Sequence, residues 1–175
     1  YSQRKFKDSA ETYGKISTNF PKYRQVLFEK TWAAFRAGEV DLALGSIASQ
    51  SSGFFSRYLE PEAYLIKIYL FKRLCRDDEA EQTLDEVKKF QSALRSGSYK
   101  YQEWARSEPM TRALLKLIEG FEKDASIDDD SFEYKAREKE VESLKSTLKK
   151  SFKVTKQRLL QEIDSIASFG VLAVT

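Results

Sequence analysis

The amino-acid sequence predicts an all-α protein. Apolar residues recur at helical spacing over most of the chain. No stretch alternates apolar and polar residues convincingly, as a half-buried strand would. Glycine occurs only 7 times and proline 3 times among 175 residues. Because these two residues interrupt regular elements, their scarcity favours long, unbroken helices.

Five helices are predicted in the first half of the chain. Apolar residues with helical spacing occupy residues 11–16, 23–37, 41–49, 62–75 and 77–90. Turn signals separate them: Pro21 follows the first, Gly38 follows the second, and Pro61 marks the start of the fourth. The predicted helices therefore come in pairs, which prompts a search for an internal repeat.

The helix pairs share a repeated spacing of residues. Gly38 is followed by Ala43, Ile47 and Gln50, and Cys75 is followed at the same spacings by Ala80, Leu84 and Val87. Upstream, the spacing recurs at Ser9, Tyr13 and Ile16 and leads to Pro21. The first two copies are offset by 34 residues, and the second and third by 37.

This pattern resembles the tetratricopeptide repeat (TPR), a helix-turn-helix unit of about 34 residues whose pairs stack into a superhelix. On that resemblance, Gly38 matches the glycine of the turn inside the repeat, and Cys75 replaces it in the next copy. Ala43 and Ala80 match the small residue at the closest approach of the two helices. Leu27 and Tyr64 match the early tryptophan position of the first helix, and Ala34 and Phe71 match its later aromatic position. Pro21 matches the proline that closes a repeat. The sequence departs from the family's leucine-glycine pair at Lys30 with Thr31 and at Lys67 with Ile68.

The resemblance covers residues 1–90, in which the first repeat is truncated; an unrelated helical bundle with alanines at its contacts is the alternative. Residues 91–130 are predicted to be a helical connector, with a helix that starts near Ser107 and Pro109 and an acidic link at 124–130. Residues 131–175 are predicted to contain one long amphipathic helix, unbroken to about residue 168.

The long helix is expected to serve two purposes. Part of its apolar stripe should cap the repeat array, since the last helix of such an array needs its open face covered. The rest of the stripe, around Leu159, Ile163 and Ile166, should find nothing to pack on within the chain and should meet another chain or missing sequence.

A partner-binding groove is predicted from the first helix of each pair. Phe28 and Trp32 are four residues apart, so they share a face of one helix. The TPR geometry implies that this face looks into a concave groove. The residues predicted to bind a partner there are Gln25, Phe28, Trp32, Arg36, Leu65, Tyr69, Lys72 and Arg73. An aromatic and basic groove of this kind suits a peptide. The alternative is that the second half of the chain covers these aromatic residues.

The sequence offers little for catalysis, and we expect no enzyme, no cofactor and no metal site. Histidine, the commonest general base and metal ligand, is absent. Cys75 therefore lacks the usual partner of a cysteine nucleophile and is predicted to be structural. The acidic runs 77–79 and 128–130 lack the spaced ligands and glycine of a calcium loop.

Charge patterning points to proteins rather than nucleic acids as partners. The net charge is only +3, and no apolar run is long enough to span a bilayer. Six basic residues and no acidic residue lie between Lys145 and Arg158. Such a run is usually a solvated face, and the sharper interpretations are contact with an acidic partner or with anionic lipid. It lacks interleaved aromatic residues, so RNA or DNA is not expected.

The sequence therefore predicts a non-enzymatic scaffold that binds a protein or peptide through a TPR groove. The alternative is a structural protein that self-associates through the long helix. Residues 23–90 further resemble TPR proteins of gliding and predatory bacteria, which implies an envelope or motility assembly and favours the periplasm or cell envelope over the cytoplasm. The chain begins without methionine, and we expect it to be a piece of a longer protein from which any localisation signal has been removed.

Overall fold

The chain folds into helices and connecting turns throughout its described parts. The computed structural model describes residues 3–52, 59–107, 109–123 and 132–174. The helices in these ranges are α1 (Gln3–Gly14), α2 (Tyr23–Ala37), α3 (Val40–Gln50), α4 (Pro61–Arg73), α5 (Asp77–Ser96), α6 (Tyr101–Ala105), α7 (Pro109–Lys123) and α8 (Phe132–Val174). The prediction of an all-α protein with a long C-terminal helix is confirmed.

The helix boundaries agree best with the prediction where a turn residue fixes them. Helix α2 has the predicted bounds, because Gly38 ends it with φ +79°. Helix α1 was predicted at 11–16 but begins at Gln3 and ends at Gly14. Helix α5 continues past Phe90 because Leu94, which is fully buried, extends its apolar face until Gly97 ends the helix at φ +76°. The predicted acidic link at 124–130 lies outside the described residues.

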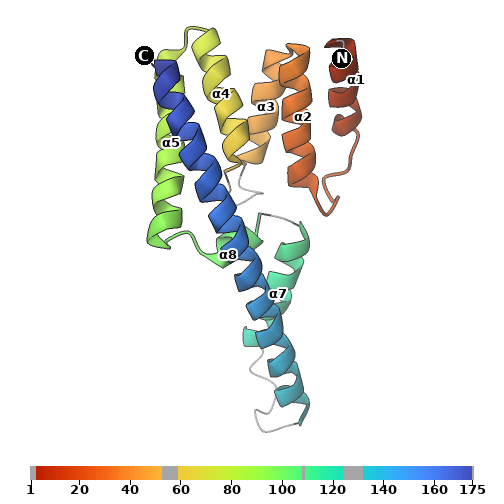
Figure 1. Ribbon diagram of the computed structural model, residues 1–175. Coiled ribbons are helices and arrows are strands. Elements are labelled where there is room, and N and C mark those ends of the chain that lie inside the picture. The colour runs from red at the N-terminus through yellow and green to blue at the C-terminus, as the bar shows by residue number, and fades with distance from the viewer. Residues whose placement is uncertain (1–2, 53–58, 108, 124–131, 175) are drawn as a thin grey trace.

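Helices α1 to α5 form one layer of neighbours that alternate in direction (Figure 1). Helix α2 packs between α1 and α3, and α4 packs on α5 while also contacting α2 and α3. The two small residues predicted at close helix contacts, Ala43 and Ala80, are 0% and 2% exposed. Their predicted burial is confirmed.

The turns that end α2 and α4 have the same geometry. The Glu39 amide donates to the Ala34 carbonyl over 2.9 Å, and the Arg76 amide donates to the Phe71 carbonyl over 2.9 Å. Both turns place a residue with positive φ directly before that donor: Gly38 at +79° and Cys75 at +55°. This is the Schellman arrangement, which satisfies carbonyl groups at a helix C-terminus. Cys75 therefore adopts the left-handed conformation that glycine adopts in the first pair.

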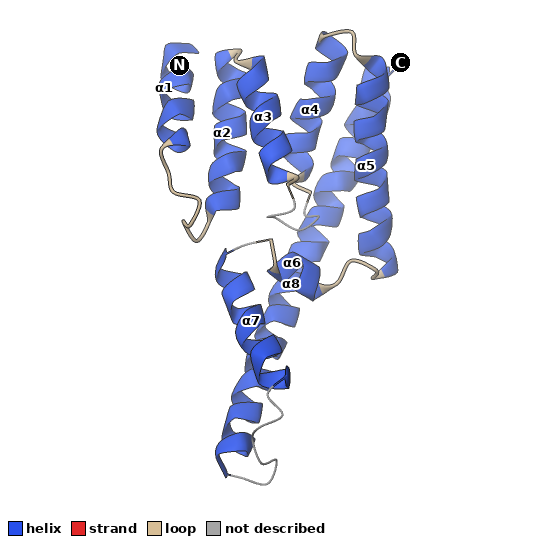
Figure 2. Ribbon diagram, turned by 180° about the vertical axis from the view of Figure 1, so that it is seen from behind, coloured by secondary structure: helices blue, strands red, loops and turns tan. Residues whose placement is uncertain are grey.

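Helix α8 packs along α4 and α5 with its C-terminal half and along α6 and α7 with its N-terminal half (Figures 1 and 2). Its upper part runs beside α4 in the same direction as α2 and α4 (Figure 1). Leu159, Ile163 and Ile166 are 0%, 1% and 4% exposed. The expectation that this distal stripe lacks a partner within the chain was wrong: it is the part of α8 that covers the helix pairs.

Two groups of side-chain contacts reinforce the position of α8. Asp164 accepts hydrogen bonds from Gln91 over 2.6 Å and from Arg95 over 2.8 Å, both on α5. Lower down, the Phe152 ring lies 6.1 Å from the Tyr99 ring and 5.9 Å from the Trp104 ring, centroid to centroid. The aromatic residues that the sequence gathers at 99–104 therefore hold α6 against α8.

Helix α7 and the N-terminal half of α8 project from the layer as a two-helix arm (Figures 1 and 2). Leu115 and Ile118 of α7 are buried, and the Phe121 ring stacks on the Tyr134 ring at 5.4 Å. Lys145 of α8 forms an ion pair with Glu122 of α7 over 2.8 Å. The arm arises because α8 is about 65 Å long at 1.5 Å per residue, longer than any helix of the layer.

Replacing Ala43 or Ala80 with leucine should destabilise the fold. Both sites are closed, so the added carbon atoms must displace neighbouring side chains or backbone. Each change should lower the free energy of unfolding by about 1–3 kcal/mol, as measured by urea denaturation. Ala48 on the exposed side of α3 is the matched control, and leucine there should have little effect. Equal stability of all three variants would contradict the close packing.

Cys75→Gly should stabilise the fold, and Gly38→Ala should destabilise it. Each position has positive φ, which costs a residue with Cβ roughly 1–2 kcal/mol, while glycine costs about 0.4–1 kcal/mol of chain entropy. The net changes in unfolding free energy should be about 1 kcal/mol, opposite in sign. Gly45→Ala is the control, because Gly45 lies inside α3 where a Cβ meets nothing within 4 Å. Gly45→Ala should stabilise the fold. If all three variants change the free energy of unfolding in the same direction, positive φ does not explain the effects.

Candidate functional site

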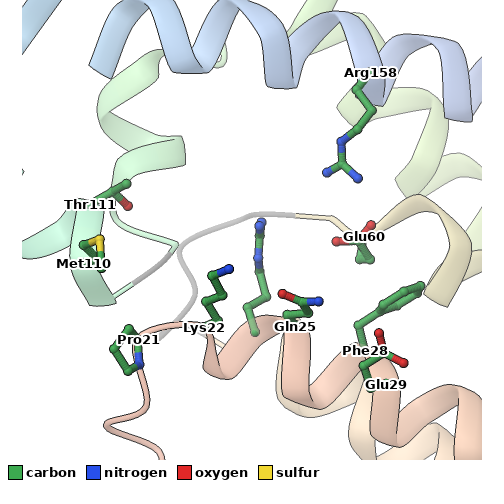
Figure 3. Close-up of a pocket in the computed structure, with 10 residues that line it drawn as sticks. Pro21, Lys22, Gln25, Phe28, Glu29, Glu60, Met110, Thr111 and Arg158 are labelled. Carbon is green, nitrogen blue, oxygen red and sulfur yellow. The ribbon is translucent and has the colours of Figure 1, made fainter. Parts of the chain in front are cut away.

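A cleft of about 480 Å³ lies between the start of α2, the start of α4, α7 and α8. Its walls are formed by Pro21, Lys22, Arg24, Gln25, Phe28, Glu29, Glu60, Met110, Thr111 and Arg158. Figure 3 shows Arg158 reaching from α8 toward Glu60, while Met110 and Thr111 face the α2 side chains across the opening. The start of α7 and residue Arg158 of α8 therefore complete a cleft whose other walls come from the starts of α2 and α4.

Charges of both signs meet in the cleft. Its cationic groups are Lys22, Arg24 and Arg158, and its carboxylates are Glu29 and Glu60. Burial raises the pKa of the half-buried Glu60 carboxyl above its ordinary value, and the guanidinium groups of Arg24 and Arg158 oppose that rise. Arg24 of α2 and Arg158 of α8 thus both act on the carboxyl of Glu60, the residue before α4.

A second carboxylate extends this charged cluster along α8. Glu162 accepts a hydrogen bond from Arg158 Nη1 over 3.1 Å, and its other oxygen is buried without a hydrogen-bond partner in the described structure. Burial also raises the pKa of Glu162, against the effect of Arg158. The negative charge of Glu62 raises the pKa of Glu162 further. The cluster is therefore poorly solvated and rich in carboxylates at its α4–α8 side.

An aromatic row lies between α2 and α4, next to this cluster. The Trp32 indole donates from Nε1 to Glu62 Oε2 over 3.3 Å. The Trp32 and Phe35 rings lie 5.8 Å apart in an edge-to-face arrangement, and the Phe35 and Tyr69 rings lie 5.6 Å apart in the same way. Tyr69 remains 51% exposed at the end of the row.

The predicted partner-binding residues separate into groups in the structure. Gln25 and Phe28 line the cleft, and Trp32 and Tyr69 belong to the aromatic row. Leu65 is half-buried and Arg73 is exposed.

The two other predicted residues make contacts within the chain, away from the cleft lining. The Arg36 guanidinium lies 5.3 Å from the centroid of the Phe6 ring of α1, and Lys72 pairs with Asp77 over 2.8 Å. Binding of a partner by any of these side chains stays a prediction.

Sequence reasoning missed the residues that give the cleft its charge. Glu60 is marked in the sequence only by its place before the helix-starting Pro61, and Arg158 only as the end of a basic run. Arg24 and Met110 carried no signal at all. These residues come together because α8 packs along α4 and α7 packs on α8, and the sequence contains no periodicity that reports such a long-range contact.

Few other groups in the described residues suggest chemistry. No group of three or more acidic or cysteine side chains there is placed to hold a metal ion. Cys75 is exposed in the turn after α4. Within the described ranges, no helix combines the length and the apolar character that a bilayer crossing requires. The acidic run at 128–130 lies outside the described residues.

Comparison with protein families, with curated proteins and with solved structures finds no match to this chain.

Replacing Glu60 with glutamine should change how stability depends on pH. A carboxyl whose pKa is raised by folding binds its proton more tightly in the native state, so this group destabilises the fold as pH rises above the unfolded value of 4.5. The wild type should therefore lose stability relative to Glu60→Gln between about pH 4.5 and neutrality. Urea denaturation across that range measures the difference. Glu11→Gln on the exposed side of α1 is the control, and a parallel response of both variants would contradict the burial of Glu60.

Proposed function

We propose that this protein is a non-enzymatic interaction module that binds a peptide segment of another protein in the cleft between α2, α4, α7 and α8. The observation that carries the proposal is the cleft itself, which combines apolar Phe28 and Met110 with charges of both signs. Such a surface suits a peptide that inserts an apolar side chain and pairs its flanking charges. Trp32 and Tyr69 extend the same side of the layer as a contact surface.

We further propose that the helix pairs α2–α3 and α4–α5 are TPR-like repeats. The matching hydrogen bonds at the turns after α2 and α4, offset by 37 residues, support this. So does the burial of Ala43 and Ala80 at the same offset. Helix α8 then stands where the first helix of a further repeat would stand, because it contacts both α4 and α5, as α4 contacts both α2 and α3. A place in a bacterial envelope or motility assembly is also part of the proposal and rests on the sequence resemblance alone.

A library of short random peptides displayed on phage tests the proposed binding. Purified protein should select peptides, and the double variant Lys22→Ala with Gln25→Ala should bind them about tenfold more weakly. Both residues are exposed, so the fold should remain intact. The double variant Gln82→Ala with Lys89→Ala on α5 is the matched control and should bind like the wild type. Failure to select any peptide, or equal binding by both double variants, would refute the cleft as the binding site.

Self-association through the arm is the second candidate. Met110 and Leu117 of α7 are 60% and 64% exposed, and they lie seven residues apart on one side of that helix. Exposed apolar side chains on a projecting helix are typical of interfaces. Analytical ultracentrifugation over a wide concentration range distinguishes the two candidates, because a monomer throughout leaves only the cleft.

A further inference from the structure

The surface of α8 beside and opposite its buried stripe carries a cluster of lysines. Lys149, Lys150 and Lys153 are exposed, and Lys156 is half-exposed. At 100° per residue, Lys150 and Lys153 lie on the side of α8 away from Leu148 and Leu159, which are 3% and 0% exposed. Lys149 and Lys156 lie beside that buried stripe. We call these four lysines the lysine face.

The lysine face forms no ion pair with the rest of the described chain. No carboxylate lies within 4.0 Å of any of its four ammonium groups in the described residues. The acids at its two ends are engaged elsewhere: Glu142 pairs with Lys145 over 2.6 Å, and Asp164 pairs with Arg95 over 2.8 Å. Like charges gathered without counter-ions on a folded surface attract an anionic partner.

We propose that the lysine face binds an anionic phospholipid surface. The lysines lie on a straight helix at the outside of the molecule, in front of α5 to α7 in Figure 1 and behind them in Figure 2, where a flat surface can approach. All four are lysines, whose compact hydrated charges suit diffuse attraction to headgroups more than the paired bonds of arginine. Val154, 68% exposed beside them, offers an apolar contact at the same surface.

Two other anionic partners fit the lysine face less well. A single-stranded nucleic acid needs open aromatic rings for stacking, but the Tyr101 ring next to the face lies 5.7 Å below the Lys149 ammonium. An acidic peptide is best held in a groove, and the described cleft opens on the Arg158 side of α8, away from the four lysines. A flat anionic surface needs neither feature.

Co-sedimentation with phosphatidylcholine vesicles, with and without phosphatidylserine, tests the proposal. The wild type should bind only the vesicles that contain phosphatidylserine, and raising the salt concentration should release it. The variant K149Q/K150Q/K153Q/K156Q should bind these vesicles roughly 600-fold more weakly, since each of the four lysines near such a surface contributes about fivefold.

The control variant is K5Q/K15Q/K89Q/K116Q, which removes four exposed lysines elsewhere and therefore has the same net charge. It should bind phosphatidylserine vesicles like the wild type, and thermal unfolding should show that both variants are folded. Absence of wild-type binding, or an equal loss in both variants, would overturn the proposal. Binding of the wild type to a polyglutamate peptide or to single-stranded DNA, but not to vesicles, would overturn it in favour of that partner.

Discussion

The packing of the distal half of α8 onto α4 and α5 is the contact on which the rest of the structure depends. Leu159 and Ile163 lie in the same buried core as Ala63 and Val87, so the helix pairs are closed by a segment far away in the sequence. The same contact brings Arg158 to the cleft and fixes the base of the arm. Without it, the apolar faces of α4 and α5 would be open to water and the cleft would lose a wall.

The cleft keeps charge where solvent is scarce, which is costly for a fold. A half-buried carboxylate loses hydration that opposite charges only partly replace. At Glu60 the attraction of Arg24 and Arg158 does not cancel the effect of burial, and at Glu162 one oxygen has no hydrogen-bond partner in the described structure. Ionisable groups with shifted pKa values are enriched at functional sites of proteins.

Helix α8 connects these features because its three sides meet different surroundings. One side is apolar and joins the core, the side with Arg158 faces the cleft, and the side with the lysine face is open to solvent. A helix turns by 100° per residue, so residues close together in the chain point to different sides. Leu159 joins the core, Arg158 faces the cleft, and Lys156 belongs to the lysine face. A partner in the cleft and a surface on the lysine face would therefore both act on the same rigid element.

The sequence by itself determined the helices and several details of their packing. Helical spacing gave α2 its bounds and revealed the long C-terminal helix, because amphipathic patterns and turn residues act over a few residues. The offset between Gly38 and Cys75 placed two turns that have the same hydrogen bonds, and the offset between Ala43 and Ala80 placed two buried contacts. Each of these features depends on residues close together in the chain.

Only the tertiary structure decided which apolar stripe covers which helix and where the charges meet. Leu159 and Ile163 look the same in sequence whether they face α5 or another chain, so the expectation that they lack a partner failed. Glu60, Arg24 and Arg158 are separated by long stretches of chain and meet because α8 folds back along α4. Periodic apolar residues specify that one face of a helix must be buried, but hydrophobic attraction has no direction. Which apolar surface covers that face is therefore decided by the close packing of the whole fold.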